Sequence, residues 1–415
     1  MKLFKHQQDI LNADPKKCGL FLGTGTGKTI TSLMLARGTT LVIAPKTTRE
    51  DKTWERNLAK LDHHKITKLH VISKEEARRD LHMTPRYDTI IIDEAHTVSG
   101  VNPQIVYRNR QPYPKTSQVF EAVFRYIKRT CPDRLYLLTA TPIRSPMSVL
   151  AIAWLLGRDW DFYKFRDTYY FKLPIHGREI WSPKMHSMLK DRMAKTVNGL
   201  GFSGKLSDFA DVPEQTYITR VVGLTQEQKK EIASLPLEYP DPIVLLGKKH
   251  QVEQGVLAGD QFNSPKEFSE NKTEAIIDLY TEFGKVLVFA KYTAQIEMYK
   301  RKLEKEGIKV FTLTGQTKDR EALMRDAEAC ESCVVISQAS VSAGYELPSF
   351  RCTVYASESY SVVDRIQSEG RTLRINAINR NLYVNLVSDE IDSAVRKSIE
   401  NKVDFSERVY VESNK

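Results

Sequence analysis

Short runs of almost uninterrupted apolar residues recur in the first third of the chain. They are Leu20–Leu22, Thr40–Ala44, Leu69–Ser73, Thr89–Asp93 and Arg134–Thr139. Runs of this length without polar alternation are typical of strands in a parallel sheet that is covered on both faces. Segments with helical spacing lie between them, for example residues 29–37, a helix that Gly38 is expected to end.

The pattern fades between about Pro146 and Lys272 and then returns. The second series of apolar runs is Lys285–Ala290, Lys309–Thr314, Cys333–Ser337, Cys352–Ser357 and Leu382–Val387. Strands that alternate with helical segments indicate parallel α/β units. We therefore predict two successive open α/β units joined by an irregular middle, within the two or three domains that 415 residues allow.

The composition is that of a globular protein, with 41% hydrophobic and 27% charged residues. The formal net charge of +10 favours a polyanionic partner, although it also serves solubility. The five cysteines are scattered and predict no disulfide framework, and we interpret Cys330 and Cys333 as incidental thiols rather than zinc ligands. The sequence shows neither a secretory signal nor an apolar stretch of membrane-spanning length, which favours a reducing, cytosol-like compartment and no membrane partner.

The stretch "FLGTGTGKT" predicts a phosphate-binding loop between a strand and a helix. Exposed backbone N–H groups and a helix N-terminus both favour bound phosphate. Lys28 is expected to reach the β- and γ-phosphates and Thr29 to ligate Mg²⁺. The usual pattern has glycine where this chain has Leu22, but three glycines keep the loop permissive. The predicted loop residues are Gly23, Thr24, Gly25, Thr26, Gly27, Lys28 and Thr29.

The stretch "TIIIDEAH" (Thr89–His96) places two acids at the end of a predicted strand. In an open α/β sheet this edge is where ligands bind. Asp93 is expected to hold Mg²⁺ through its water shell, and Glu94 to orient and deprotonate the attacking water.

Four stretches in this order resemble the superfamily 2 helicase and translocase ATPases. They are Lys28–Thr29, "DEAH" at 93–96, "LTATP" at 138–142 and "QSEGRTLR" at 367–374. Further stretches are similar to the Swi/Snf-type branch in its compact phage or bacterial form. These are "LFKHQQDIL" at 3–11, the segment 42–58 with Trp54, "LT-x-EQ" within 212–232, and the helix-like segment 389–402.

The resemblance implies a fold of two tandem RecA-like lobes, each a mostly parallel sheet flanked by helices. Lobe 1 would span residues 1–214, with a helical extension from about 145, and lobe 2 would span 215–415 after an N-terminal linking segment. The cofactors would be ATP and Mg²⁺. The chain ends soon after the last helix, so we expect no histone-reading or nuclease domain.

The resemblance also implies roles for single residues. Gln7 would read the adenine, and His96, Thr139 and Thr141 would couple the nucleotide site to a nucleic-acid groove. Gln367 would contact the γ-phosphate or its water, and Arg371 and Arg374 would act as arginine fingers. On spacing alone, two arginines at i and i+3 also fit an ordinary solvated helix face.

A further set of residues matches positions at which the family contacts nucleic-acid phosphates. Amides, hydroxyls and lysines at strand ends suit such contacts, which position a polymer without reading its sequence. Each of them also fits an ordinary turn. The set is Lys46, Thr47, Ser73, Lys291, Thr314, Gly315 and Ser340. The aromatic and basic stretch Asp159–Lys172 is interpreted as helix packing rather than base stacking.

The function that the resemblance implies is a DNA-dependent ATPase motor that moves along double-stranded DNA or remodels protein–DNA complexes in a bacterial or phage-infected cytosol. Protein partners for targeting are left open. Two alternatives remain at this point: a strand-separating DNA or RNA helicase, for which no wedge element is evident, and a non-catalytic DNA clamp that uses ATP as a switch.

Overall fold

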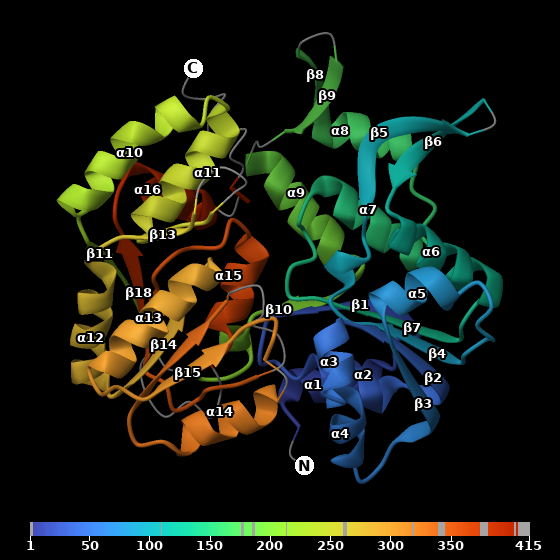
Figure 1. The fold of residues 1–415 in the computed structure, drawn as a ribbon. Coiled ribbons are helices and arrows are strands. Elements are labelled where there is room, and N and C mark those ends of the chain that lie inside the picture. Colours follow the sequence, from blue (N-terminus) through green and yellow to red (C-terminus); the bar gives the residue numbers. More distant parts are fainter. Residues whose placement is uncertain are drawn as a thin grey trace. The chain divides into compact units, whose positions relative to one another are not determined.

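The structure is a computed structural model that describes residues 3–108, 110–175, 178–184, 187–212, 214–259, 264–317, 319–338, 345–373, 381–401 and 404–405. The chain divides into two compact units, Met1–Ala210 and Asp211–Lys415 (Figure 1). Within the described ranges, no helix is both long and apolar enough to cross a membrane.

Unit 1 is built on a six-stranded parallel sheet with the strand order β10-β1-β7-β4-β2-β3. The five strands predicted from the first apolar series are confirmed, and β10 is a further strand at the edge of the sheet. The strands are β1 (Lys17–Leu22), β2 (Arg37–Ala44), β3 (Lys65–Ser73), β4 (Thr89–Ile92), β7 (Arg134–Leu138) and β10 (Gly201–Gly204).

Both faces of this sheet are covered, which explains why its strands are apolar without alternation. Val42 faces a cluster that includes Leu33 and Trp54, whereas its neighbour Ile43 faces a second cluster that includes Val123. The first face carries α1 (Lys5–Ala13), α2 (Lys28–Leu35) and α4 (Thr53–Ala59). The second carries α5 (Lys74–Asp80), α6 (Gln118–Thr130), α7 (Pro146–Leu155), α8 (Phe162–Tyr169) and α9 (Ser187–Asn198).

Gly38 does not end a helix, and that prediction is wrong. Helix α2 stops at Leu35, and Gly38 lies within β2 with a φ of 65° at the point where the register against β3 shifts. A Cβ atom there would lie 2.3 Å from the Asp88 carboxylate, so the glycine serves a strand irregularity and a close approach.

Two antiparallel hairpins stand outside the central sheet of unit 1 (Figure 1). One is β5 (Val101–Arg108) with β6 (Gln111–Thr116), and the other is β8 (Tyr170–Ile175) with β9 (Arg178–Pro183). Between them in sequence, the packing interpretation of the aromatic and basic stretch is confirmed for α8. There the buried Arg166 lies over the ring of Trp181, with 4.0 Å between its guanidinium and the ring centre.

Asp14 ties three elements of unit 1 together at the turn between α1 and β1. Its Oδ1 and Oδ2 each accept a hydrogen bond of 2.8 Å from Arg134, and Oδ1 accepts another of 3.0 Å from Arg37. Chiefly because of the hydrogen bonds from Arg134, the pKa of Asp14 is lowered to about 2.

Replacing Asp14 with asparagine should therefore change the acid stability of unit 1. Because the folded-state pKa lies below the unfolded one, the stabilisation is present above pH 4 and is lost as the pH falls toward 2. The side chain is 43% exposed, so water screens it and we expect a cost of only about 1 kcal/mol at neutral pH. Urea titrations between pH 2 and 7 should show a flatter pH dependence for D14N than for the wild type. The exposed Asp133, replaced in the same way, serves as the control.

Unit 2 contains a second six-stranded parallel sheet, with the order β11-β18-β17-β14-β16-β15. The five strands predicted from the second apolar series are confirmed. The strands are β11 (Gln215–Val221), β14 (Lys285–Phe289), β15 (Val310–Leu313), β16 (Cys333–Ser337), β17 (Cys352–Tyr355) and β18 (Asn381–Val387). A short pair, β12 (Val256–Leu257) and β13 (Lys266–Glu267), lies apart from it.

Helices cover both faces of this sheet as well. Val288 faces a cluster shared with Ile276 and Ile296, and Leu287 faces one shared with Met324. The helices of unit 2 are α10 (Gln226–Glu238), α11 (Pro242–Glu253), α12 (Lys272–Phe283), α13 (Thr293–Lys305), α14 (Arg320–Ala329), α15 (Val362–Glu369) and α16 (Glu390–Glu400).

The prediction of an irregular middle is wrong. Regular helices occupy much of the stretch between 146 and 272, from α7 to α11. Helix α7 explains the missing signal, because eight of its ten residues are buried. A helix that is apolar on all sides shows no periodic alternation.

Candidate nucleotide and nucleic-acid site

The predicted phosphate loop connects the end of β1 to the start of α2. Gly25 and Gly27 have φ values of 76° and 81°, a left-handed conformation that favours glycine. Thr26 donates a 2.8 Å hydrogen bond from Oγ1 to the Gly23 carbonyl and closes the loop on itself. A Cβ atom at Gly27 would lie 2.4 Å from the Gln7 amide nitrogen, so the loop also needs glycine for close packing.

Lys28 points back over this loop from the first turn of α2. Its ammonium group donates hydrogen bonds of 2.7 Å and 2.8 Å to the carbonyl oxygens of Leu22 and Gly23. The ammonium is thus held beside a glycine-rich turn and a helix N-terminus, the combination that favours a bound phosphate.

Gln7 is 3% exposed and contacts the phosphate loop directly. Its side-chain amide donates to the Gly27 carbonyl at 3.3 Å and to Thr31 Oγ1 at 3.2 Å, while its Oε1 accepts from the Phe4 N–H at 2.9 Å. The adjacent His6 ring nitrogen lies 2.9 Å from the Thr26 carbonyl. Helix α1 is thereby attached to the loop, and adenine recognition by Gln7 stays a prediction.

The two acids follow β4 at the same edge of the sheet. The Asp93 N–H donates to the Ile43 carbonyl at 2.8 Å, and the Glu94 N–H donates to Asp93 Oδ1 at 3.0 Å. Burial and the Glu94 charge raise the pKa of Asp93, while Lys28 and a hydrogen bond from Trp54 lower it in part. A carboxylate in this surrounding is stabilised by a cation.

Glu94 adopts a left-handed conformation, with a φ of 46°, that only a few per cent of non-glycine residues show. The residue is the N-cap of the short 3-10 helix η1 (Ala95–Thr97), and its Oε2 lies 3.3 Å from His96 Nδ1. The surrounding fold therefore fixes the direction of this carboxylate, as is common at functional sites.

The three predicted coupling residues lie together. His96 Nδ1 is 3.0 Å from Thr139 Oγ1, which in turn accepts a 3.0 Å hydrogen bond from the Thr141 N–H. Thr139 directly follows β7, whose neighbour in the sheet is β4. A continuous chain of contacts therefore runs from Glu94 through His96 to residues 139–141.

These residues fit the cofactors that the resemblance implies. Thr29, in the first turn of α2, offers a hydroxyl, and Asp93 offers an anionic oxygen, both suited to Mg²⁺. The loop from Gly23 to Gly27, with Thr24 between its first two glycines, offers the glycine-rich backbone that suits a nucleoside triphosphate. When bound, Mg·ATP would supply the scissile phosphoanhydride bond and the charge neutralisation that its transfer requires.

The candidate nucleic-acid residues of unit 1 continue along the same edge. The carboxyl ends of parallel strands meet at one edge, and β4, β2 and β3 are neighbours there. Lys46 and Thr47 begin α3 (Lys46–Glu50) directly after β2, and the Lys46 ammonium lies 3.6 Å from the Glu50 carboxylate. Ser73 ends β3 and is buried, and its hydroxyl accepts from the Glu76 N–H at 3.1 Å. Its hydroxyl therefore caps α5.

The corresponding residues of unit 2 follow β14 and β15, which flank β16 in the sheet. The Lys291 N–H donates to Ser357 Oγ at 2.7 Å, and its ammonium lies 2.6 Å from the centre of the Tyr360 ring. Thr314 and Gly315 form the turn after β15, where the Gln316 N–H donates to Thr314 Oγ1 at 3.3 Å. Ser340 lies outside the described residues.

The stretch "QSEGRTLR" begins in α15. The Arg371 guanidinium donates 3.0 Å and 2.9 Å hydrogen bonds to the carbonyls of Gln367 and Tyr345. Gln367 itself is partly exposed on α15. Arg374 lies outside the described residues.

A buried polar network in unit 2 was not found from the sequence. Lys272 is 1% exposed, and its ammonium donates to Asp392 Oδ2 at 2.7 Å, Gln254 Oε1 at 2.7 Å and the Ala356 carbonyl at 2.6 Å. Asp392 also lies 3.1 Å from His250 Nε2. Burial raises the pKa of Asp392, but Lys272 and His250 outweigh it and lower that pKa overall. Asp392 is 120 residues from Lys272 and 142 residues from His250 in the sequence, so no local spacing predicts these contacts.

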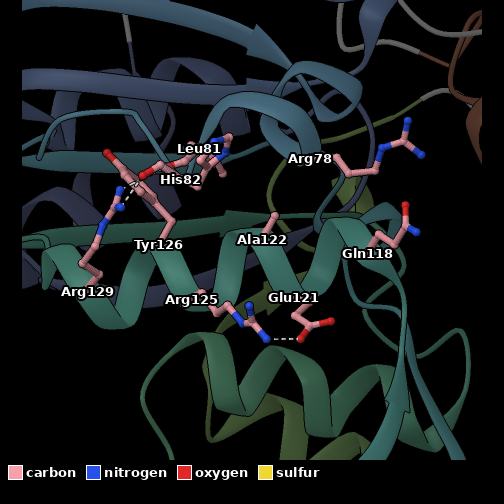
Figure 2. Close-up of a pocket in the computed structure, with 9 residues that line it drawn as sticks. All are labelled: Arg78, Leu81, His82, Gln118, Glu121, Ala122, Arg125, Tyr126 and Arg129. Atoms are coloured by element: carbon pink, nitrogen blue, oxygen red, sulfur yellow. Dashed lines mark hydrogen bonds and ion pairs between the residues drawn. The ribbon is translucent and has the colours of Figure 1, made fainter. Parts of the chain in front are cut away.

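A pocket of about 490 Å³ lies between α5 and α6 of unit 1 (Figure 2). Its walls carry Arg78 and an Arg125–Glu121 ion pair, and Arg129 donates to the Leu81 carbonyl at 2.9 Å. None of the predicted site residues lines it, so this pocket is separate from the candidate nucleotide site.

Comparison with known proteins agrees with this organisation. Residues 271–376 match the family described as "Helicase conserved C-terminal domain". No curated protein sequence matches the chain.

Two solved structures are similar over nearly the whole chain. S. cerevisiae Dbp5 bound to RNA and ADP BeF3 is 14% identical with a TM-score of 0.54, covering 98% of this chain and 89% of that one. The Sulfolobus solfataricus SWI2/SNF2 ATPase core in complex with dsDNA is 18% identical with a TM-score of 0.40, covering 97% and 91%. The two parallel α/β units thus have the architecture of tandem RecA-like lobes, and the predicted fold class is confirmed. The Swi/Snf-type branch stays a prediction.

Proposed function

We propose that this protein is a nucleic-acid-dependent ATPase motor that moves along double-stranded DNA or remodels DNA and its complexes. The observation that carries the proposal is the chain of contacts at the edge of the first sheet. It begins at Lys28 on the phosphate loop, includes Asp93 and Glu94, and reaches Thr139 and Thr141 through His96.

Under this proposal, the residues in this series of contacts each have a chemical role. Lys28 holds phosphate oxygens, and Thr29 and Asp93 hold Mg²⁺. Glu94 orients and deprotonates the attacking water, and its fixed backbone keeps the carboxylate aimed. Gln367 and Arg371 of unit 2 also take part in turnover. His96 connects Glu94 to Thr139 and Thr141 through polar contacts, so a change in the position of the Glu94 carboxylate can move these two residues.

The preference for duplex DNA comes from the resemblance to the Swi/Snf-type branch and from a net charge of +10 that favours a polyanion. One structural neighbour was solved with double-stranded DNA and another with RNA. The segment after β2 offers the Lys46 ammonium and the Thr47 hydroxyl for phosphate contacts.

The deciding experiment compares steady-state ATP hydrolysis alone and with duplex DNA, single-stranded DNA or RNA, at one low salt concentration. We expect Mg²⁺-dependent turnover that rises severalfold with duplex DNA. Salt must be fixed, because a basic protein also binds polyanions non-specifically. If no nucleic acid changes the rate, the motor proposal fails.

A second pair of assays separates movement along a duplex from strand separation. A translocase displaces the third strand of a triplex without releasing either strand of the duplex. Release of a labelled strand from a fork without triplex displacement would replace the proposal with a helicase. ATP-dependent DNA binding without hydrolysis would replace it with a clamp.

A further inference from the structure

We infer that the β5–β6 hairpin of unit 1 is a nucleic-acid contact that binds an unpaired strand, with Tyr107 stacking on a base and Arg110 and Lys115 contacting phosphates. This inference rests on the nucleic-acid-dependent activity in the proposed function, not on its preference for duplex DNA, and it assigns a substrate contact that no sequence pattern indicated. The hairpin directly follows the "DEAH" segment and stands outside the central sheet (Figure 1).

The composition of the hairpin fits a nucleic acid. Residues 101–116 contain three basic residues, Arg108, Arg110 and Lys115, and no acidic residue. Two of its tyrosines are unusually accessible, since Tyr107 is 76% and Tyr113 48% exposed. Exposed aromatic rings interleaved with cations form the usual platform for unpaired bases and their phosphates.

The register places the best exposed groups at the end of the hairpin. Arg108 pairs with Gln111 and Tyr107 with Pro112, so Tyr107 lies one position from the turn. Arg110 is exposed in the turn with a left-handed φ of 63°. Arg110 and the accessible Tyr107 ring therefore lie at the tip, whereas the exposed Lys115 lies nearer the base, next to Thr116.

The strands of the hairpin are poorly suited to bind another protein strand. Pro112 and Pro114 both lie in β6, where each removes a backbone donor, and β5 has a register shift between Val101 and Ile105. Such features blunt an edge against strand addition. The hairpin would therefore recognise a partner through the charged and aromatic side chains at its tip and not through its strand edges.

The base of the hairpin is attached to the candidate catalytic segment. The Ser117 N–H donates to the Gly100 carbonyl at 2.7 Å, and Ser99 Oγ donates to the Ala95 carbonyl at 2.7 Å. Strand β5 also packs against α7, whose Ser148 Oγ donates to the Pro142 carbonyl at 3.1 Å. The base of the hairpin therefore contacts both the "DEAH" segment and the helix that follows "LTATP". Binding of a nucleic-acid strand at the tip can affect both segments through these contacts.

The test compares two double variants by fluorescence anisotropy on a single-stranded DNA oligonucleotide and on a duplex of the same sequence. Y107S/R110G removes the ring and the guanidinium, and glycine suits the left-handed turn. Y107F/R110K keeps a ring and a positive charge. K16S removes an exposed lysine before β1 as the charge-matched control.

We expect Y107S/R110G to bind the single strand about tenfold more weakly, with a larger loss than on the duplex. The slope of log affinity against log salt should fall by about 0.7 for the lost phosphate contact, which a merely structural role would not produce. Y107F/R110K and K16S should bind like the wild type. Equal losses on both probes, or no loss on either, would overturn the inference.

Stimulated ATP turnover separates this inference from the proposed function. If the wild type is stimulated by nucleic acid and Y107S/R110G is stimulated equally, only the hairpin inference fails. If the wild type is not stimulated by any nucleic acid, the proposed function fails. Unchanged melting temperatures of the variants show that the fold is intact.

Discussion

Replacing Glu94 with glutamine is expected to lower ATP turnover at least about 100-fold while ATP binding is retained. An amide cannot accept the proton of the attacking water, but it has the same shape as the carboxylate. It can still hydrogen-bond to His96, whose Nδ1 lies 3.3 Å from Glu94 Oε2. The phosphate loop and Lys28 are unchanged, so the affinity for a fluorescent ATP analogue should be close to that of the wild type.

The control is Glu55→Gln, the same chemical change at an exposed position of α4. It should leave turnover and binding as they are. Single-turnover hydrolysis is the better readout, because it reports chemistry rather than product release. Full turnover in E94Q would remove Glu94 from the mechanism, and loss of ATP binding would show that its role is structural.

The central sheets were predictable because their strands are buried on both faces. Val42 and Ile43 face different hydrophobic clusters, so neither position tolerates a polar residue and the run stands out in the sequence. The same burial hid α7, since a helix without a polar side has no period to detect. A high local content of apolar residues therefore made the strands predictable from the sequence but gave no periodic signal for helix α7.

Part of the candidate site could also be predicted from the sequence, because some of its residues are adjacent in the chain. Gly25, Gly27 and Lys28 are adjacent in sequence, and a strand followed by a helix already places them together. The contact between His96 and Thr139 joins residues 43 positions apart, and the resemblance to a family gave the expectation that they act together. The β5–β6 hairpin carried no such pattern, because its prolines and asparagines are also typical of a loop.

The Lys272 network could not be predicted from the sequence, because its residues come together only in the tertiary structure. Lys272 begins α12, Asp392 lies in α16 and His250 in α11. A lysine at the start of a helix is usually solvated, and nothing near it in sequence indicates a partner. Among the described residues, His250, Glu253 and Asp392 also form a group with the ligand types of a metal site. The Lys272 ammonium already supplies a positive charge there.

Replacing Lys272 with methionine is expected to destabilise unit 2 by about 3–5 kcal/mol. Methionine has a similar volume but leaves the Asp392 carboxylate buried without its cation, 2.7 Å from where the ammonium was. The loss also frees the Ala356 carbonyl, which lies beside the Ser357 hydroxyl that accepts from the Lys291 N–H. Urea unfolding followed by circular dichroism would measure the change in free energy.

The double variant K272M/D392L separates loss of the ion pair from loss of packing. With both charges gone, neither member of the pair is left as a buried ion, and burial raises the pKa of the neighbouring Glu253 to about 8, so the double variant should be more stable than K272M alone. His250 is fully buried and burial lowers its pKa, so it can stay neutral beside leucine. If the two substitutions are additive instead, the 2.7 Å contact contributes little, and the network is held by its other hydrogen bonds. The first outcome would establish that the Lys272 cation stabilises unit 2 by its contact with Asp392 and so joins α12 to α16.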